Sequence, residues 1–314
     1  MSLLSSTFGL LVRTRNELYG RGILPVRRLQ GPVVSVGNLS VGGSGKTPFV
    51  LLLGELLKAR GIHFDILSRG YHRKTRGVAL VDPAGCATDY GDEPLLLARR
   101  LSVPVVVGED RYDAGLFSER RFGPQMHILD DGFQHRALAR DFDIVLVTAE
   151  DARDGLLPAG RLREPLSSLQ RADVVVLTDE APADSFPLVR KLVWQISRGL
   201  EPRQVPSRPL VFCGIARPQN FIQQLRAAGI EPTAHAFFRD HHAYTERDIR
   251  DLLDLCNKSG ADGFVTTEKD EINLGPHLFA LQPLTVLPVR MELVDAANAV
   301  DTMLRMINDR RRSA

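Results

Sequence analysis

The feature that most restricts the fold of this chain is a glycine-rich turn at residues 40–47, with the sequence SVGGSGKT. An apolar run at 33–36 precedes it and predicts a buried strand, and the segment 48–58 that follows it predicts a helix. Strand, glycine-rich turn and helix is the arrangement of a phosphate-binding loop. Glycines let the backbone curl so that N–H groups point at phosphate oxygens, and the helix start adds its positive dipole end.

The predicted nucleotide-binding residues are the members of this turn: Ser40, Val41, Gly42, Gly43, Ser44, Gly45, Lys46 and Thr47. The Lys46 ammonium is expected to reach the terminal phosphates and the Thr47 hydroxyl to bind Mg²⁺. Ser40 stands where the general pattern has its first glycine, and the alternative is a chance glycine-rich turn. The complete Gly45-Lys46-Thr47 ending, between a strand and a helix, favours the phosphate loop.

The bulk composition is typical of a soluble globular protein, with 44% hydrophobic and 25% charged residues. A chain of 314 residues is long enough for two domains. Its formal net charge of +2 does not indicate nucleic-acid binding, and we predict none. The cysteines Cys86, Cys213 and Cys256 lack metal-ligand spacing, so we expect reduced core thiols in a cytosolic setting.

The N-terminal segment predicts a helix. No apolar run approaches the ~20 residues of a membrane span, and the order of charges does not fit a signal peptide. The expected apolar face of the helix consists of Leu4, Phe8, Leu11, Val12, Leu18 and Tyr19. Such a helix either lies on an anionic lipid surface or packs on its own domain, and periodicity alone favours the second interpretation.

Apolar runs at 64–67, 103–107, 126–129, 144–147 and 174–177 alternate with helical segments. This alternation predicts an α/β fold with a mainly parallel sheet and helices on both faces. Prolines gather between residues 198 and 209 and mark a linker, after which a second, smaller α/β set begins.

Several ends of these predicted strands carry charged residues. The second strand runs into a basic segment, 68–76, which is either an anion-binding loop or a solvated charge run. The strand at 126–129 runs into Asp130 and Asp131, which has Walker-B character, and Asp130 is the first choice for a Mg²⁺ ligand. Arg163 follows a proline- and glycine-rich stretch and could clamp phosphate or pair with a nearby acid such as Glu164.

An ordered set of blocks along the chain resembles the tetraacyldisaccharide 4'-kinase (lipid A 4'-kinase) family. The blocks lie at 34–48, 67–71, 91–94, 110–111, 130–135 and 157–165, with weaker ones at 240–241 and 267–270. Each block alone is unspecific, but the ordered set is highly specific and covers nearly the whole chain. The family shares the serine at the position of Ser40.

The resemblance implies a reaction and a place in the cell. The γ-phosphate of ATP would be transferred to the 4'-hydroxyl of a tetraacylated glucosamine disaccharide 1-phosphate, giving lipid IVA in the lipopolysaccharide pathway of a Gram-negative bacterium. The implied cofactors are ATP and Mg²⁺, and no obligate protein partner is implied. Because the substrate is a lipid, the resemblance also reverses the preference for the N-terminal helix, which would make a peripheral contact with the cytoplasmic face of the inner membrane.

The resemblance also implies two α/β/α sandwich domains that are joined by a two-stranded linker and close over the nucleotide. We expect a P-loop kinase domain at 1–200 and a smaller α/β domain at 206–284. The linker strands are expected near 192–200 and 284–292, and the C-terminal helix, 293–314, is expected to pack back on the first domain.

By resemblance, particular residues acquire roles. Asp92 is the candidate base, assisted by His241 from the second domain, and Lys46 is the third catalytic residue. The alternative, non-catalytic roles are those of an acid at a helix start for Asp92 and of a histidine in a surface loop for His241. The candidate Mg²⁺ ligands are Thr47, Asp130, Glu93 and Asp131. The candidate contacts to substrate or phosphate are Arg69, Arg111, His135 and Arg163.

Two other classes of protein compete with this interpretation. A P-loop switch ATPase of the partition or metal-insertion type has a similar loop, but the extra lysine that such proteins carry near its start is absent here. A non-catalytic peripheral membrane module would not need the set of Lys46, Thr47 and Asp130. No guanine-specific N-K-x-D element is apparent, which favours ATP over GTP.

Overall fold

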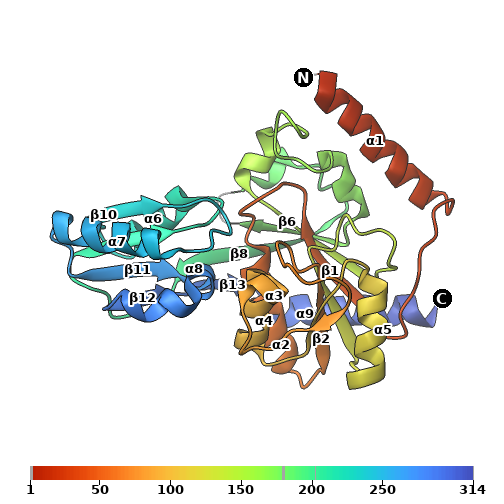
Figure 1. Ribbon diagram of the computed structural model, residues 1–314. Coiled ribbons are helices and arrows are strands. Elements are labelled where there is room, and N and C mark those ends of the chain that lie inside the picture. The colour runs from red at the N-terminus through yellow and green to blue at the C-terminus, as the bar shows by residue number, and fades with distance from the viewer. Residues whose placement is uncertain (1–2, 179–180, 202, 314) are drawn as a thin grey trace.

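The computed structural model describes residues 3–178, 181–201 and 203–313. Within these ranges it contains a nine-stranded sheet and a four-stranded sheet, each covered by helices (Figure 1). We call the first sheet with its helices the large unit and the second sheet with its helices the small unit. The predicted α/β fold class, with a larger, mainly parallel sheet and a smaller one, is confirmed.

The sheet of the large unit has the strand order β13-β8-β7-β6-β1-β5-β2-β4-β3. Its strands are β1 (Val33–Asn38), β2 (Phe64–Ser68), β3 (Ala79–Leu80), β4 (Val105–Val107), β5 (Met126–Asp130), β6 (Phe142–Val147), β7 (Val174–Thr178), β8 (Leu192–Leu200) and β13 (Val289–Leu293). Neighbouring strands are parallel except β3 with β4 and β8 with β13. The central strands β1, β2, β5 and β6 are buried along their whole length, as expected for a sheet covered on both faces.

Side chains on alternate positions of these strands enter two different cores. Ile144 and Leu146 of β6 join one core, which is also lined by helices α2, α4 and α9. Val145 and Val147 point to the opposite face of the sheet and belong to the second core. The helices of the large unit are α1 (Leu3–Gly20), α2 (Lys46–Lys58), α3 (Ala87–Tyr90), α4 (Asp92–Leu101), α5 (Arg111–Phe122) and α9 (Ala296–Arg312), with 3-10 segments η1 (Ala149–Arg153), η2 (Leu166–Arg171) and η3 (Ala183–Ser185).

The small unit is built on a parallel sheet with the order β10-β9-β11-β12. Its elements are β9 (Pro209–Cys213), α6 (Pro218–Ala227), β10 (Ala234–Phe237), α7 (Glu246–Ser259), β11 (Gly263–Thr267), α8 (Glu268–Leu274), η4 (Gly275–Ala280) and β12 (Leu284–Leu287). Helix α6 packs on one face of this sheet and α7 on the other. Thr245 begins α7 with a capping box, in which its side chain accepts from the backbone N–H of Asp248.

Two antiparallel strands connect the units. The chain leaves the large sheet through β8 and returns through β13, with Val289 opposite Leu200 and Leu293 opposite Ile196. The segment 284–292, predicted to be a linker strand, is divided between β12 in the small sheet and β13 in the large sheet. Helix α9 then buries Val300 and Met303 in the core of the large unit. The domain boundaries at 200 and 206 stay a prediction, and Pro202 in the proline-rich stretch lies outside the described residues.

Two expectations from the sequence are wrong. Cys86 is exposed, although the other two cysteines are buried. The other is the interpretation of α1 that periodicity alone favoured and the resemblance reversed, in which the apolar face packs on its own domain: Leu4 and Leu11 of that face are exposed, and the buried residues of the helix are Ser5 and Gly9. The physical reason is close approach, because a Cβ at Gly9 would lie 2.7 Å from Leu156 Cδ1. Periodicity of large side chains does not detect a contact made by small ones.

A buried imidazole connects β5 to β2 and α5. His127 is fully buried, with Nδ1 at 2.8 Å from Asp65 Oδ1 and Nε2 at 3.3 Å from Glu119 Oε1. Burial alone would lower the pKa of His127, but the two carboxylates raise it above its ordinary value. A raised pKa in the folded state stabilises the fold below the unfolded value of about 6.5, and this contribution is lost as pH rises through the folded value.

We therefore expect His127→Gln to lower the free energy of unfolding more at pH 6 than at pH 9. Urea denaturation of both proteins at the two pH values measures this difference. A difference that does not change with pH would show that His127 is not protonated in the folded chain.

Candidate active site

The carboxyl ends of the parallel strands of the large sheet meet the small unit at a cavity of about 740 Å³. The loop after β1, the ends of β2 and β5 and the start of α4 contribute to it, as expected for open α/β sheets. Most of the predicted site residues line this cavity: Ser40, Val41, Gly42, Gly43, Ser44, Gly45, Lys46, Thr47, Arg69, Asp92, Glu93, Asp130, Asp131, Arg163 and His241. Arg111 and His135 are not among its lining residues.

The glycines of the loop are required by its backbone. Gly42, Gly43 and Gly45 have φ values of 76°, 52° and 82°, which L side chains rarely adopt. A Cβ on Gly43 would also lie 2.9 Å from Arg217 Cγ of the small unit. Gly45 immediately precedes α2, so the free N–H groups of the first helical turn open toward the loop. The loop thus has the backbone of an anion-binding site.

Lys46 lies among polar groups of the loop and the neighbouring strands. Its Nζ donates to Asn38 Oδ1 at 3.0 Å and lies 3.5 Å from Asp131 Oδ1. Arg163 donates to both oxygens of Asp131, at 2.9 and 2.8 Å. Burial would raise the pKa of Asp131, but Lys46 and Arg163 lower it well below its usual range, so this carboxylate is ionised.

Asp130, at the end of β5, is buried beside the same loop. Its Oδ2 accepts from Ser68 Oγ at 3.0 Å, and its Oδ1 has no hydrogen-bond partner in the part of the chain that the structure describes. Burial, followed by the charges of Glu93 and Asp131, raises the pKa of Asp130 to about 7. A cation at this point would stabilise the ionised form, because opposite charge lowers a carboxyl pKa.

These donors suit a hard cation such as Mg²⁺. Within the described ranges, no group of three or more histidine, cysteine, aspartate or glutamate side chains is arranged to hold a metal by itself. Mg²⁺ is commonly bound by one or two carboxylates and takes its other ligands from phosphate and water. The free Oδ1 of Asp130, beside a loop shaped for phosphate, fits that pattern of donors.

Across the cavity, a carboxylate and an imidazole from different units form a pair. Asp92 is the first residue of α4 and is 4% exposed, and His241 Nδ1 lies 2.9 and 2.8 Å from its two oxygens. Asn273 of α8 also donates to Asp92 Oδ2, at 3.1 Å. His241 has a φ of 60°, a strained conformation that often occurs at functional sites.

The surroundings of this pair keep Asp92 ionised. Burial would raise the pKa of Asp92, but the hydrogen bond from His241 and the charge of Lys269 lower it to about 2. Burial lowers the pKa of His241, yet the hydrogen bond to Asp92 more than offsets this and raises it. The pair therefore offers an anionic oxygen and an adjacent imidazole to a group in the cavity.

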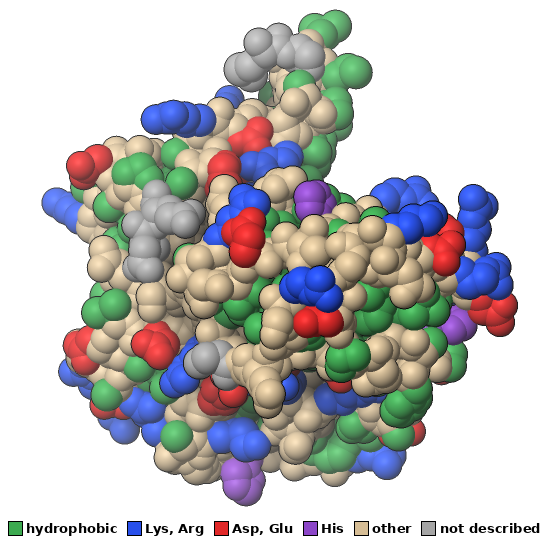
Figure 2. All heavy atoms as spheres, turned by 90° about the vertical axis from the view of Figure 1, so that its left-hand side faces the viewer, with side chains coloured by type: hydrophobic (Ala, Val, Ile, Leu, Met, Phe, Trp, Pro, Cys, Tyr) green, Lys and Arg blue, Asp and Glu red, His purple; other side chains and the backbone are tan. Residues whose placement is uncertain are grey.

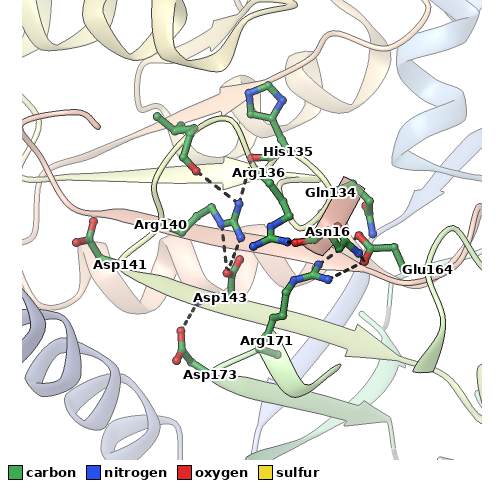
Figure 3. Close-up of polar contacts among 12 residues, drawn as sticks. Asn16, Gln134, His135, Arg136, Arg140, Asp141, Asp143, Glu164, Arg171 and Asp173 are labelled. Atoms are coloured by element: carbon green, nitrogen blue, oxygen red, sulfur yellow. Dashed lines mark hydrogen bonds and ion pairs between the residues drawn. The ribbon is translucent and has the colours of Figure 1, made fainter. Parts of the chain in front are cut away.

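Arg111 and His135, the two predicted contacts that do not line the cavity, lie near one another. Arg111 is 6% exposed and donates to the Glu109 carbonyl at 2.8 Å. Burial, followed by the charge of Arg111, lowers the pKa of His135 to about 4, so its ring is neutral. Its Nε2 has no hydrogen-bond partner among the described residues. In Figure 3 the His135 ring points away from the neighbouring ion pairs.

Figure 3 also shows how the end of α1 is held beside His135. The side chain of Asn16 donates to Glu164 Oε2 at 2.7 Å, and the backbone carbonyl of Asn16 accepts from Arg136 at 2.6 Å. Glu164 pairs with Arg171 at 2.8 Å, so the acid that pairs with Arg163 is Asp131 and not Glu164. This network connects α1 to the loops that carry His135 and Arg163.

Several residues of the site were not predicted from the sequence. Lys269 and Asn273 of α8 contact Asp92, and Arg217 pairs with Glu150 at 3.0 Å across the two units. The only signal for Lys269 was its position directly after an apolar strand, in the Thr-Glu-Lys-Asp block. The approach of α8 to α4 depends on how the two units meet, which no local pattern contains.

A phosphate loop with its lysine, two acids at the end of the neighbouring strand β5 and a carboxylate–imidazole pair across the cavity define a P-loop phosphotransferase. A family model described as tetraacyldisaccharide-1-P 4'-kinase matches residues 1–308. The chain belongs to the tetraacyldisaccharide 4'-kinase family.

Similar proteins support this assignment along the whole chain. The tetraacyldisaccharide 4'-kinase of Koribacter versatilis is 49% identical, over 99% of this chain and 99% of the relative. The protein of that name from Geobacter metallireducens is 39% identical, over 97% of both chains. A crystal structure of LpxK from Aquifex aeolicus in complex with ATP matches with a TM-score of 0.79 and 34% identity, and covers 97% of both chains.

Proposed function

We propose that this chain transfers the γ-phosphate of ATP to the 4'-hydroxyl of a tetraacyldisaccharide 1-phosphate, which gives lipid IVA. The observation that carries the proposal is the pair of Asp92 and His241, which lines the same cavity as the phosphate loop. Nucleotide binding alone does not require such a pair. Transfer to an alcohol does, because the hydroxyl must lose a proton to a nearby acceptor.

Positioning and charge stabilisation would supply most of the rate in this reaction. The N–H groups of the loop and Lys46 would hold the β- and γ-phosphates. Thr47 and Asp130, with Glu93 or Asp131 as further donors, would hold Mg²⁺. The bound ion would neutralise charge on the phosphate oxygens. Arg163 would keep Asp131 ionised through its two hydrogen bonds.

Asp92 would take up the proton of the sugar hydroxyl. With a pKa of about 2, it is a weak base toward a free alcohol. In a loose transition state, however, the attacking hydroxyl becomes acidic late, when bond formation to phosphorus has advanced. His241 would orient the Asp92 carboxylate through Nδ1 and stabilise the negative charge that Asp92 carries before it takes up the proton.

The lipid would reach the site along the base of α1. Arg69 lines the cavity, and the buried Arg111 lies close enough to lower the pKa of His135. A guanidinium and a neutral imidazole with a free nitrogen can bind the phosphate and hydroxyls of a sugar. We propose that Arg69, Arg111 and His135 contact the acceptor, whereas Arg163 acts on the phosphate-loop side.

One assay tests this function against the switch-ATPase alternative. The protein is incubated with Mg²⁺, γ-labelled ATP and tetraacyldisaccharide 1-phosphate in detergent micelles, and lipid and inorganic phosphate are separated. We expect the label to enter the lipid, and only when the 4'-hydroxyl is free. A 4'-deoxy lipid is the matched control. Release of inorganic phosphate without labelled lipid would overturn the proposal in favour of a hydrolase.

The outer face of α1 supports a peripheral contact with the cytoplasmic face of the inner membrane. No helix in the described ranges is long and apolar enough to cross a bilayer. The leucines at positions 3, 4, 10 and 11 are nevertheless exposed, between 65% and 84%. Figure 2 shows this end of α1 projecting from the body of the molecule with hydrophobic side chains along it. An amphipathic helix with one packed and one apolar exposed side can lie in a lipid surface.

Replacing these four leucines by serine should lower partitioning onto anionic vesicles at least tenfold, since each buried leucine contributes roughly 1.5–3 kcal/mol. Sedimentation with vesicles of phosphatidylglycerol and phosphatidylethanolamine measures the effect. Phe279→Ser, which removes an 82% exposed side chain from the small unit, is the matched control and should not change partitioning. Equal binding of the leucine variant and the wild type would remove the membrane role of α1.

A further inference from the structure

A half-buried ammonium group, that of Lys269, lies beside the pair of Asp92 and His241 and lines the same cavity. Lys269 is the second residue of α8, directly after β11, and its side chain is 17% exposed. Its Nζ lies 3.0 Å from Asp240 Oδ1, 3.3 Å from His241 Nε2, 3.4 Å from Glu93 Oε1 and 3.8 Å from Asp92 Oδ2. One lysine of the small unit therefore contacts two acids of α4 and two residues of its own unit.

The contact with His241 restricts the position of a proton. An ammonium group has three donors and no acceptor. At 3.3 Å, Lys269 forms a hydrogen bond with His241 Nε2 only if that nitrogen carries a lone pair. In the neutral form of the ring, the proton then resides on Nδ1, which faces the two oxygens of Asp92. Lys269 thus favours the tautomer in which His241 donates to Asp92.

Helix α8 presents a hydrogen-bond donor, Asn273, and a positive charge, Lys269, to Asp92 from one face. Lys269 and Asn273 are four residues apart, so they lie one above the other on the helix. Asn273 donates to Asp92 Oδ2 at 3.1 Å while Lys269 contacts Glu93 and His241. A neutralising partner for Lys269 would require only one carboxylate, and Asp240 at 3.0 Å already provides it. The contacts to Glu93 and His241 are additional to that requirement.

We propose that Lys269 is a positioning residue for phosphoryl transfer, which fixes the tautomer of His241 and holds Asp92 and Glu93 of the large unit against His241 of the small unit. The expected change in kcat rests on the proposed function, whereas the expected tautomer of His241 does not. Lys269 acts through its neighbours and is not itself required to touch the substrate.

The test uses the full chain and four single variants. Lys269→Met and Lys269→Gln remove the charge, and Lys269→Arg keeps it. Arg100→Gln is the matched control, because it removes another ion pair between the units, with Glu268, without touching Asp92 or His241. We expect kcat to fall about 100-fold in K269M and K269Q, with KM for ATP within about threefold, and to be restored to within about tenfold in K269R. R100Q should stay within about threefold of wild type.

Two readouts distinguish positioning from a merely structural role. In a His241→Gln background, adding K269M should lower kcat less than about threefold, because the residue through which Lys269 acts is already gone. Nitrogen-15 spectra of the histidines, recorded at a pH where the His241 ring is neutral and with its signals assigned from H241Q, should show the proton on Nδ1 in wild type and a mixture of tautomers in K269M or K269Q. The spectra need no substrate, so they stand even if no lipid is phosphorylated.

The proposal is overturned by any of three results. The first is a kcat within twofold of wild type in a K269M or K269Q variant that melts at the wild-type temperature. The second is an equal fold-loss from K269M in the wild-type and H241Q backgrounds. The third is an unchanged His241 tautomer in both uncharged variants. If both uncharged variants fail to fold while K269R folds, the role of Lys269 is structural and the proposal is likewise rejected.

Discussion

Replacing Asp92 by Asn should lower kcat for lipid phosphorylation by about 1,000-fold and leave KM for ATP within about threefold, because the lost group is proposed to act on the proton of the acceptor. Asparagine has nearly the same shape and can still accept hydrogen bonds from His241 and Asn273. It carries no negative charge, however, and cannot take up the proton at neutral pH. Steady-state kinetics with labelled ATP measures the loss, and Asp92→Ala should behave similarly.

The chain offers a matched control for this variant. Asp65 is a second buried carboxylate paired with a histidine, His127, on a neighbouring strand of the same large sheet. It does not line the cavity. Asp65→Asn should lower the melting temperature and leave kcat within about threefold of wild type. Near-normal turnover in the Asp92→Asn protein would reject its role as the base.

Replacing Lys46 by Met should lower kcat/KM for ATP by at least about 1,000-fold, since the ammonium stabilises charge on the transferring phosphoryl group. The variant should fold, because the neighbours of Lys46 in the structure are polar groups at the cavity wall. Binding of ATP should also weaken, so the rise in melting temperature that ATP produces in wild type should shrink.

Lys58, at the other end of α2, is the matched control for Lys46. Its Nζ donates to the Leu101 carbonyl at 2.7 Å and it does not line the cavity. Lys58→Met should leave kinetics within about threefold of wild type. If Lys46→Met keeps both its turnover and its stabilisation by ATP, the phosphate loop is not the nucleotide site.

The phosphate loop could be predicted from sequence because its signal is local. A strand, three glycines at left-handed positions and a helix start lie within one short segment, and their order alone determines the backbone. The position of Asp130 beside the loop could be predicted in the same way, since Asp130 ends a strand whose parallel neighbour carries the loop. The fold class followed from the alternation of apolar strands with helices.

Other parts of the site depend on which surfaces meet. Glu93 and Lys269 are 176 residues apart in the chain, and their contact exists only because α4 and α8 approach one another. The proposed role of His241 came from family resemblance and not from any pattern in its own segment. The packed side of α1 was not predicted because a serine and a glycine form it, and such small side chains do not contribute to a hydrophobic periodicity.

The antiparallel pairing of β8 with β13 has a consequence for any movement between the two units. The ribbon of two strands is the covalent connection between them, so the small unit would move relative to the large unit as one body attached to that ribbon. Such a movement would change the contact of Arg217 with Glu150, beside the phosphate loop, together with the contact of His241 with Asp92. Occupancy of one half of the cavity would therefore be reported to the other half by rigid geometry, without any relay of side chains between them.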